Sequence, residues 1–200
     1  WFKNRTRSSP HRLVDAVRGL PNMLMTNTTG VEATAAADGT MVRTVTGFAP
    51  DGFTLGMDDG GYRVNSSTGD DIVAWCWDMG GTTASNTSGS ITSSSVRANT
   101  TYGQSIVSWT GDGLSKTIGH GLNSTPEMII LKNRSDVDAW EIMYDNTNPT
   151  TSIEFDTAAG RLSNYFSSVS STNFGVGPYN RSNGNGDNMI AYCFHSVTGY

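Results

Sequence analysis

The chain has few side chains that could act as catalytic bases or nucleophiles. Its three histidines, His11, His120 and His195, lie far apart in the sequence, and none belongs to a motif that pairs a base with a nucleophile. The sequence also lacks zinc-protease, Cys-x-x-Cys and nucleophile-elbow motifs, and it has no phosphate-binding glycine loop. We therefore favour structural roles for the histidines, and we predict no catalytic residues and no enzyme activity.

Two acidic pairs could supply oxygen ligands to calcium, namely Asp58-Asp59 and Asp70-Asp71. Neither pair has the alternating spacing of a calcium-binding loop. Aspartate beside glycine is typical of turns, where the carboxylate accepts hydrogen bonds from nearby backbone N–H groups. We favour ordinary turns, and we predict no metal site and no cofactor.

Aromatic side chains are the best binding candidates, because the apolar faces of sugar rings stack on exposed aromatic rings. Four tyrosines stand among Gly, Asn and Ser in expected loops and are the candidates for a glycan site: Tyr62, Tyr102, Tyr165 and Tyr179. Four other aromatic residues are predicted to pack in the core or to form contacts between chains: Trp75, Trp77, Tyr192 and Phe194.

These last four residues belong to a pattern that occurs twice. Residues 69–77 read GDDIVAWCW and residues 186–194 read GDNMIAYCF. The β-branched and aromatic content of these short, glycine-bounded runs favours a strand, and both of its faces are apolar. We therefore expect a central strand, covered on both sides, in a module that occurs twice. The matched Cys76 and Cys193 are interpreted as buried free thiols rather than as a disulfide.

The repeat extends to further segments of each copy. The matched pairs are Phe2–Arg5 with Leu131–Arg134 and Gly52–Gly56 with Asn173–Gly177. The second copy also has two expected strands, Ser105–Gly111 and Thr117–Leu122, for which the first copy has no counterpart. Because such strands would precede Trp1, we expect the 200 residues to be a fragment of a longer chain.

Composition favours many short strands joined by tight turns. Only 16% of the residues are charged and 23 are glycine, with Ser, Thr and Asn also abundant. We predict an all-β fold of two tandem antiparallel β-sandwich modules, of jelly-roll or lectin-like type. The first module comprises residues 1–79 and the second residues 105–200, with a Gly/Ser/Thr-rich connector at 80–104. Within that connector, Ile91–Val96 is β-prone but polar and is interpreted as an edge strand or arm. The one brief helix candidate is Val31–Ala37.

Charge and hydropathy exclude two classes of partner. A net charge of −5 argues against binding to a nucleic-acid backbone. No apolar run approaches the roughly 18 residues that a membrane helix needs. We predict no nucleic-acid partner and no membrane insertion.

Several phrases resemble tandem repeats of large structural proteins of marine tailed phages, cyanophages among them, which are mostly tail fibres. The phrases include Lys3-Asn4-Arg5, Asp51–Gly56, Val73–Trp77, Gly89–Ser93 and Ile118–Leu122. The resemblance covers essentially the whole chain and supplies no catalytic residue. It implies a virion structural protein in the tail, outside the host cell. It further implies a homotrimer that contacts other tail proteins and a host surface glycan.

Three alternatives to a tail-fibre segment stay open. The chain could be a carbohydrate-binding module of a secreted or surface protein, or a capsid decoration protein. A glycan-degrading enzyme is the least favoured alternative, because the sequence shows no paired-carboxylate motif.

Overall fold

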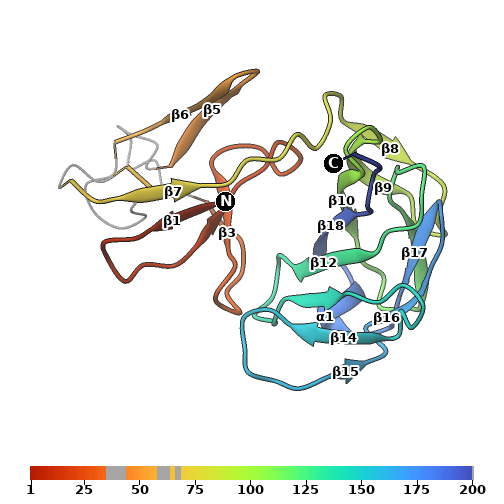
Figure 1. The fold of residues 1–200 in the computed structure, drawn as a ribbon. Helices are drawn as coiled ribbons and strands as arrows, with labels where there is room; N and C mark the ends of the chain where they lie inside the picture. The colour runs from red at the N-terminus through yellow and green to blue at the C-terminus, as the bar shows by residue number, and fades with distance from the viewer. Residues whose placement is uncertain (35–43, 58–63, 66–68, 200) are drawn as a thin grey trace. The chain divides into compact units, whose positions relative to one another are not determined.

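The protein is built almost entirely from antiparallel β-sheets. A computed structural model describes residues 1–34, 44–57, 64–65 and 69–199, with 41% strand and 2% helix. The chain divides into two compact units, Trp1–Trp77 and Asp78–Tyr200. Each unit has its own sheets (Figure 1) and its own buried cluster. The all-β prediction is confirmed.

The first unit contains a five-stranded sheet in the order β4-β3-β2-β1-β7, and β5 pairs with β6 in a second sheet. The strands are β1 Phe2–Asn4, β2 Arg12–Leu13, β3 Asn22–Met25, β4 Ala33–Thr34, β5 Val45–Ala49, β6 Gly52–Leu55 and β7 Ile72–Ala74.

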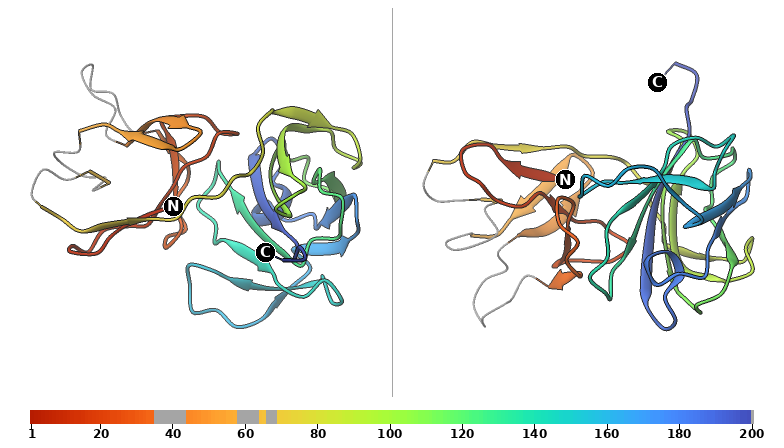
Figure 2. Two further views of the ribbon diagram at one scale, coloured as in Figure 1. Left: turned by 45° about the horizontal axis from the view of Figure 1, so that its top comes forward. Right: turned by 90° about the horizontal axis from the view of Figure 1, so that it is seen from below.

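The second unit, drawn from yellow-green to blue in Figure 1 and Figure 2, has an eight-stranded and a three-stranded sheet. Their orders are β15-β14-β13-β12-β18-β10-β9-β8 and β11-β17-β16. The elements are β8 Ala84–Asn86, β9 Ser93–Asn99, β10 Gln104–Thr110, β11 Lys116–Gly119, β12 Met128–Asn133, β13 Glu141–Met143, β14 Thr151–Glu154, β15 Leu162–Ser163, β16 Phe166–Val169, β17 Asn173–Val176, α1 Asn180–Asn183 and β18 Asn188–Phe194.

The core of the second unit lies between its two sheets. Buried side chains from both sheets form one cluster, which is the arrangement of a β-sandwich. Trp109 of β10 and Phe174 of β17 meet edge to face across this core, with ring centroids 5.8 Å apart. Strand alternation therefore directs one face of the larger sheet onto the smaller one.

The two units share strand order and register. The order β4-β3-β2-β1-β7 has the same connectivity as β15-β14-β13-β12-β18. Phe2 pairs with Ala74 across β1 and β7, and Leu131 pairs with Ala191 across β12 and β18. The sequence match is therefore also a match in hydrogen-bonding register. The larger sheet of the second unit continues past β18 to β10, β9 and β8.

A buried asparagine fixes the register in the first unit. Asn4 donates from Nδ2 to Asp70 Oδ2 over 2.8 Å. Its Oδ1 accepts the backbone N–H groups of Thr6 and Arg7, at 3.0 and 2.9 Å. One amide thus joins the turn after β1 to the turn before β7.

The second unit repeats this arrangement. Asn133 donates to Asp187 Oδ2 over 2.8 Å, and its Oδ1 accepts the N–H groups of Ser135 and Asp136. Asn133 is fully buried. This network explains why the phrases Lys-Asn-Arg and Gly-Asp recur together, as two halves of one buried polar contact.

The strand Ile72–Ala74 differs from the expectation of a central strand covered on both sides. Within the described residues β7 is the last strand of its sheet, whereas β18 lies between β10 and β12. Trp75 and Trp77 are 48% and 44% exposed, and Cys76 is exposed as well. The expectation is wrong for the first unit, because no described strand continues the sheet beyond β7.

The matched aromatic residues of the second unit have a different environment. Tyr192 is 4% exposed, and Phe194 at the strand end is half-buried. Both cysteines are free thiols, of which Cys193 is buried. The expected burial of the thiols therefore applies to Cys193 and is wrong for Cys76.

The stretch expected to be a connector contains two strands. Residues 84–86 and 93–99 form β8 and β9, which extend the larger sheet beyond β10. The sequence suggested a flexible linker at residues 80–90 and an edge strand or arm at residues 91–96, but β8 forms within the first stretch and β9 pairs with a strand on each side. The backbone ladder, which composition does not reveal, orders this segment.

The helix candidate Val31–Ala37 is also wrong over its described part. Ala33 and Thr34 form β4, and residues 35–37 lie outside the described residues. The single turn α1 was not predicted, because four polar residues carry no helical periodicity.

The asparagine network generates a stability prediction. Asn133→Ala should lower the free energy of unfolding of the second unit by about 2–4 kcal/mol, because the backbone donors and the carboxylate that Asn133 binds lose a buried partner. Amide hydrogen exchange of β12 and β18 measures this change. The exposed Asn123 provides the matched control, for which Asn123→Ala should change stability by less than about 0.5 kcal/mol. Equal effects of both variants would contradict the assignment.

The two thiols should react at very different rates. Burial raises the pKa of Cys193 to about 12, so only about one thiol in ten thousand is ionised at pH 8. Iodoacetamide should therefore alkylate Cys76 at least about 100-fold faster than Cys193 in the folded chain. Peptide mass spectrometry identifies the modified residue. Cys76→Ala should abolish the fast phase, and urea should make both thiols of the parent chain reactive.

Candidate functional site

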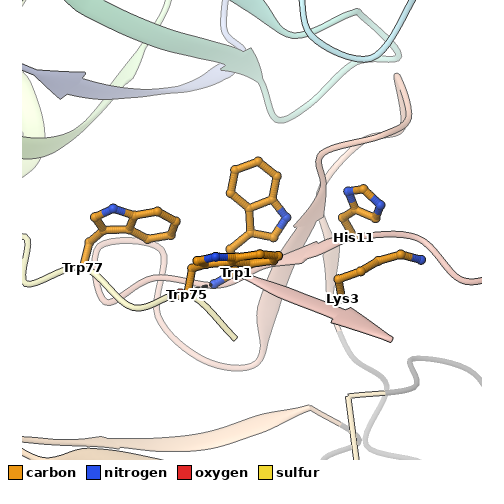
Figure 3. Close-up of a pocket in the computed structure, with 5 residues that line it drawn as sticks. All are labelled: Trp1, Lys3, His11, Trp75 and Trp77. Carbon is orange, nitrogen blue, oxygen red and sulfur yellow. Dashed lines mark hydrogen bonds between the residues drawn. The ribbon is translucent and has the colours of Figure 1, made fainter. Parts of the chain in front are cut away.

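An open hollow lies on one face of the five-stranded sheet of the first unit (Figure 3). It has a volume of about 280 Å³ and is lined by Trp1, Lys3, His11, Trp75 and Trp77. Figure 3 shows the three indoles grouped at one end, with Lys3 and His11 at the other. The hollow therefore combines broad apolar ring faces with one cationic side chain.

Strand alternation places these side chains on the same face. Trp1 and Lys3 flank Phe2, whose side chain is buried in the core on the opposite face. Trp75 lies directly opposite Trp1, because each backbone nitrogen of this pair donates to the other residue's carbonyl over 2.9 Å. The register of β1 and β7 thus brings residues from both ends of the unit together.

The indoles contact one another and remain accessible. The Trp1 and Trp75 rings lie edge to face with centroids 6.3 Å apart, and Trp1 and Trp77 have the same separation at a tilt of 39°. Nearly half of the Trp75 and Trp77 surface is exposed, at 48% and 44%. Rings in contact hold each other in place, so the exposed faces form a preorganised platform.

The polar side chains that line the hollow are those of Lys3 and His11. The Lys3 ammonium donates to the Ser9 carbonyl over 2.9 Å. Burial, followed by the nearby charge of Lys3, lowers the pKa of His11 below its ordinary value, which favours the neutral imidazole. Among the described residues that line the hollow, none is acidic. The hollow thus offers exposed ring faces, a lysine and a hydrogen-bonding imidazole.

Two of the predicted tyrosines come together in the second unit. The rings of Tyr165 and Tyr179 lie edge to face with centroids 5.5 Å apart. The guanidinium carbon of Arg181 lies 5.0 Å from the Tyr165 ring centroid, and Tyr179 is 44% exposed. Tyr102 lies in the turn between β9 and β10, and Tyr62 lies outside the described residues.

Arg181 anchors this tyrosine pair to the sheet. It contacts Glu141 over 2.7 Å and Glu154 over 2.5 Å. Burial disfavours the charge on Arg181, but the hydrogen bonds to both carboxylates outweigh burial and raise its pKa. Burial also raises the pKa of Glu141, against the hydrogen bonds from Arg181 and Ser152. The matched first-unit positions are Arg12 and Met25, so this network belongs to the second unit.

The other candidates for chemistry have structural partners. His120 is fully buried, accepts the Leu122 N–H at Nδ1 and contacts the Ser170 carbonyl through Nε2, both over 3.1 Å. The Asp70 carboxylate contacts Asn4 and Arg7.

Asp58 and Asp59 lie outside the described residues. Over the part of the chain that the structure describes, no three His, Cys, Asp or Glu side chains are placed to bind a metal ion. The same residues contain no helix long and apolar enough to cross a membrane.

Sequence reasoning missed the hollow. It assigned Trp75 and Trp77 to the core or to chain contacts, and it named neither Trp1 nor Lys3 as a candidate binding residue. The sequence did contain a signal for a shared face within each strand. Trp1 and Lys3 lie on either side of Phe2, and Trp75 and Trp77 lie on either side of Cys76, so each pair points to one face of its strand. Only the pairing of β1 with β7 shows that both sets share one face.

Comparisons with known proteins place the chain in a family without indicating an activity. No curated protein matches it, and no solved structure matches it. A family model described as a domain of unknown function, DUF7483, matches residues 1–200. Because that match covers the whole sequence, the protein belongs to the DUF7483 family.

Proposed function

We propose that the chain is a structural segment of a phage tail fibre that contributes to host attachment and catalyses no reaction. The observation that supports this most is the repetition of one strand order, with one register and one buried Asn–Asp contact, in consecutive units. Repetition of a β unit along a chain is the usual way to build an extended protein. The virion setting comes from the resemblance of the sequence phrases to tail-fibre repeats.

Exposed apolar side chains support assembly with other chains. Large apolar residues at the surface are typical of interfaces when several lie together. In the first unit Trp75 and Trp77 lie together around the hollow. We propose that such surfaces contact further copies in a homotrimer or other tail proteins.

Purified particles test the virion assignment. Antibodies raised against residues 1–200 should label the tails of phage particles in electron micrographs, and they should slow adsorption to host cells. Sedimentation of the purified chain should give the mass of a trimer. Labelling of capsids alone would support a decoration protein instead, and particles without label would reject a virion role.

The tryptophan hollow favours glycan binding as a second candidate function. Sugar rings present apolar C–H faces that stack on indoles, and their hydroxyls can bond to groups such as His11 and Lys3 at the hollow's edge. The platform is exposed and has both kinds of group. This activity is compatible with a fibre segment and equally with a free carbohydrate-binding module.

Substitution of one indole tests glycan binding. Trp77→Ala should weaken binding to host surface polysaccharide by about 10- to 30-fold, because one stacking face is lost. Calorimetric titration measures the affinity. Phe48→Ala is the matched control, since Phe48 is an aromatic residue of the same unit with 49% exposure and lies outside the hollow. Equal affinity of the parent and Trp77→Ala chains would remove the hollow as the site. A loss with Tyr179→Ala would point to the tyrosine pair.

A further inference from the structure

Matched core positions are buried in the second unit and incompletely covered in the first. In each matched pair the first-unit residue is half-buried or exposed, while its counterpart has no exposed surface. The pairs are Ile72 with Met189, Ala74 with Ala191, Cys76 with Cys193, Phe53 with Phe174 and Leu55 with Val176. The sheet of the first unit therefore has the same apolar core face as the second unit. Among the described residues, nothing covers part of that face.

The second unit shows what covers this face. Strand β10 pairs with β18 so that Val107 lies opposite Ala191 and Trp109 lies opposite Met189. Both side chains belong to the buried cluster. Strand β11 adds Ile118 opposite Phe174. In the second unit, one contiguous segment, residues 84–119, thus supplies the layer that the described part of the first unit lacks.

Among the described strands, only β1 pairs with β7, and the opposite edge of β7 has the hydrogen-bonding pattern of the β18 edge that binds β10. Toward β1, the hydrogen bonds involve Asp71 and Trp75. Because successive residues of an antiparallel strand bond to opposite sides, Ile72, Ala74 and Cys76 direct their N–H and C=O groups away from β1. Their counterparts in β18 are the residues paired with Trp109, Val107 and Ser105.

We propose that this β7 edge binds an extended strand with the sequence pattern of β10, supplied by a segment of another repeat that corresponds to residues 84–119. The strand places a Ser-like residue at Cys76, a Val-like residue at Ala74 and a Trp-like residue at Ile72. Such a strand extends the hydrogen-bond ladder beyond β7, and its side chains cover the apolar core face of the first unit. Donated strands act in this way in β-augmentation. In a repeat protein such an exchange joins consecutive units. The inference does not depend on the proposed tail-fibre role.

Pairing of two β7 edges would fit this surface less well. An antiparallel β7 pair centred on Ala74 places Ile72 opposite Cys76 and brings no large side chain toward Phe53. The β10 pattern instead brings an aliphatic residue and an indole onto the same face. The geometry therefore favours the β10-type strand over a second β7.

A fused segment tests the proposal in the full chain. A second copy of residues 84–129 is joined directly before Trp1. In the second unit residue 129 is followed by Ile130, which occupies the position that matches Trp1. The added segment is therefore connected to β1 as residues 84–129 are connected to the rest of β12. Alkylation of Cys76 by iodoacetamide and amide hydrogen exchange at Ile72 and Ala74 should both become at least about 10-fold slower than in the parent chain. Cys193 should stay unreactive in both proteins, which shows that the second unit is intact.

The matched control carries Val107→Pro in the added copy alone. Proline removes the N–H that would bond to Ala74 and disfavours a central strand. This control should restore the fast alkylation of Cys76 seen in the parent chain. The proposal is overturned if the fused chain alkylates at the parent rate, or if the proline variant protects Cys76 equally. It is also overturned if the parent chain already forms dimers in which Cys76 is protected.

Discussion

Continuity of the β-ladder is the constraint on which the rest of this structure depends. A strand inside a sheet satisfies its backbone groups on both edges, and its neighbours help to cover its side chains. Strand β18 has β10 and β12 beside it, whereas β7 has only β1 among the described strands. This single difference accounts for the buried Cys193 and the exposed Cys76 at matched positions of similar sequence.

The buried asparagines decide which residues face the core. A shift of one residue between paired strands would turn every side chain to the opposite face. Asn4 and Asn133 each bind an aspartate in the turn before the partner strand, and so lock the register at one end. With that register, Phe2 packs in the core and Trp1 faces the hollow. The Asn4–Asp70 contact therefore sets the position of the tryptophan side chains in the hollow, although neither Asn4 nor Asp70 lines the hollow.

The sequence predicted features that depend on local pattern and missed those that depend on neighbouring strands. Strands were expected at residues 105–111 and 117–122, which contain most of β10 and most of β11, and the repeated phrases predicted the matched strands β7 and β18. Tyr165 and Tyr179 were both glycan-site candidates because they stand in turn-rich sequence, but their contact with each other was not predicted. Exposure of Trp75 could not be predicted, since it depends on whether another strand lies beside β7.

The same alternating pattern can therefore serve two purposes. Trp75 and Trp77 in the first unit correspond to Tyr192 and Phe194 in the second, and the similar size of these side chains suggested packing in the core or contacts between chains. Tyr192 is indeed buried, but the indoles at the matched positions form the wall of an open hollow. Volume and alternation determine that such residues suit a sheet face. Whether that face becomes buried core or stays exposed, as at the hollow, is determined by what covers it.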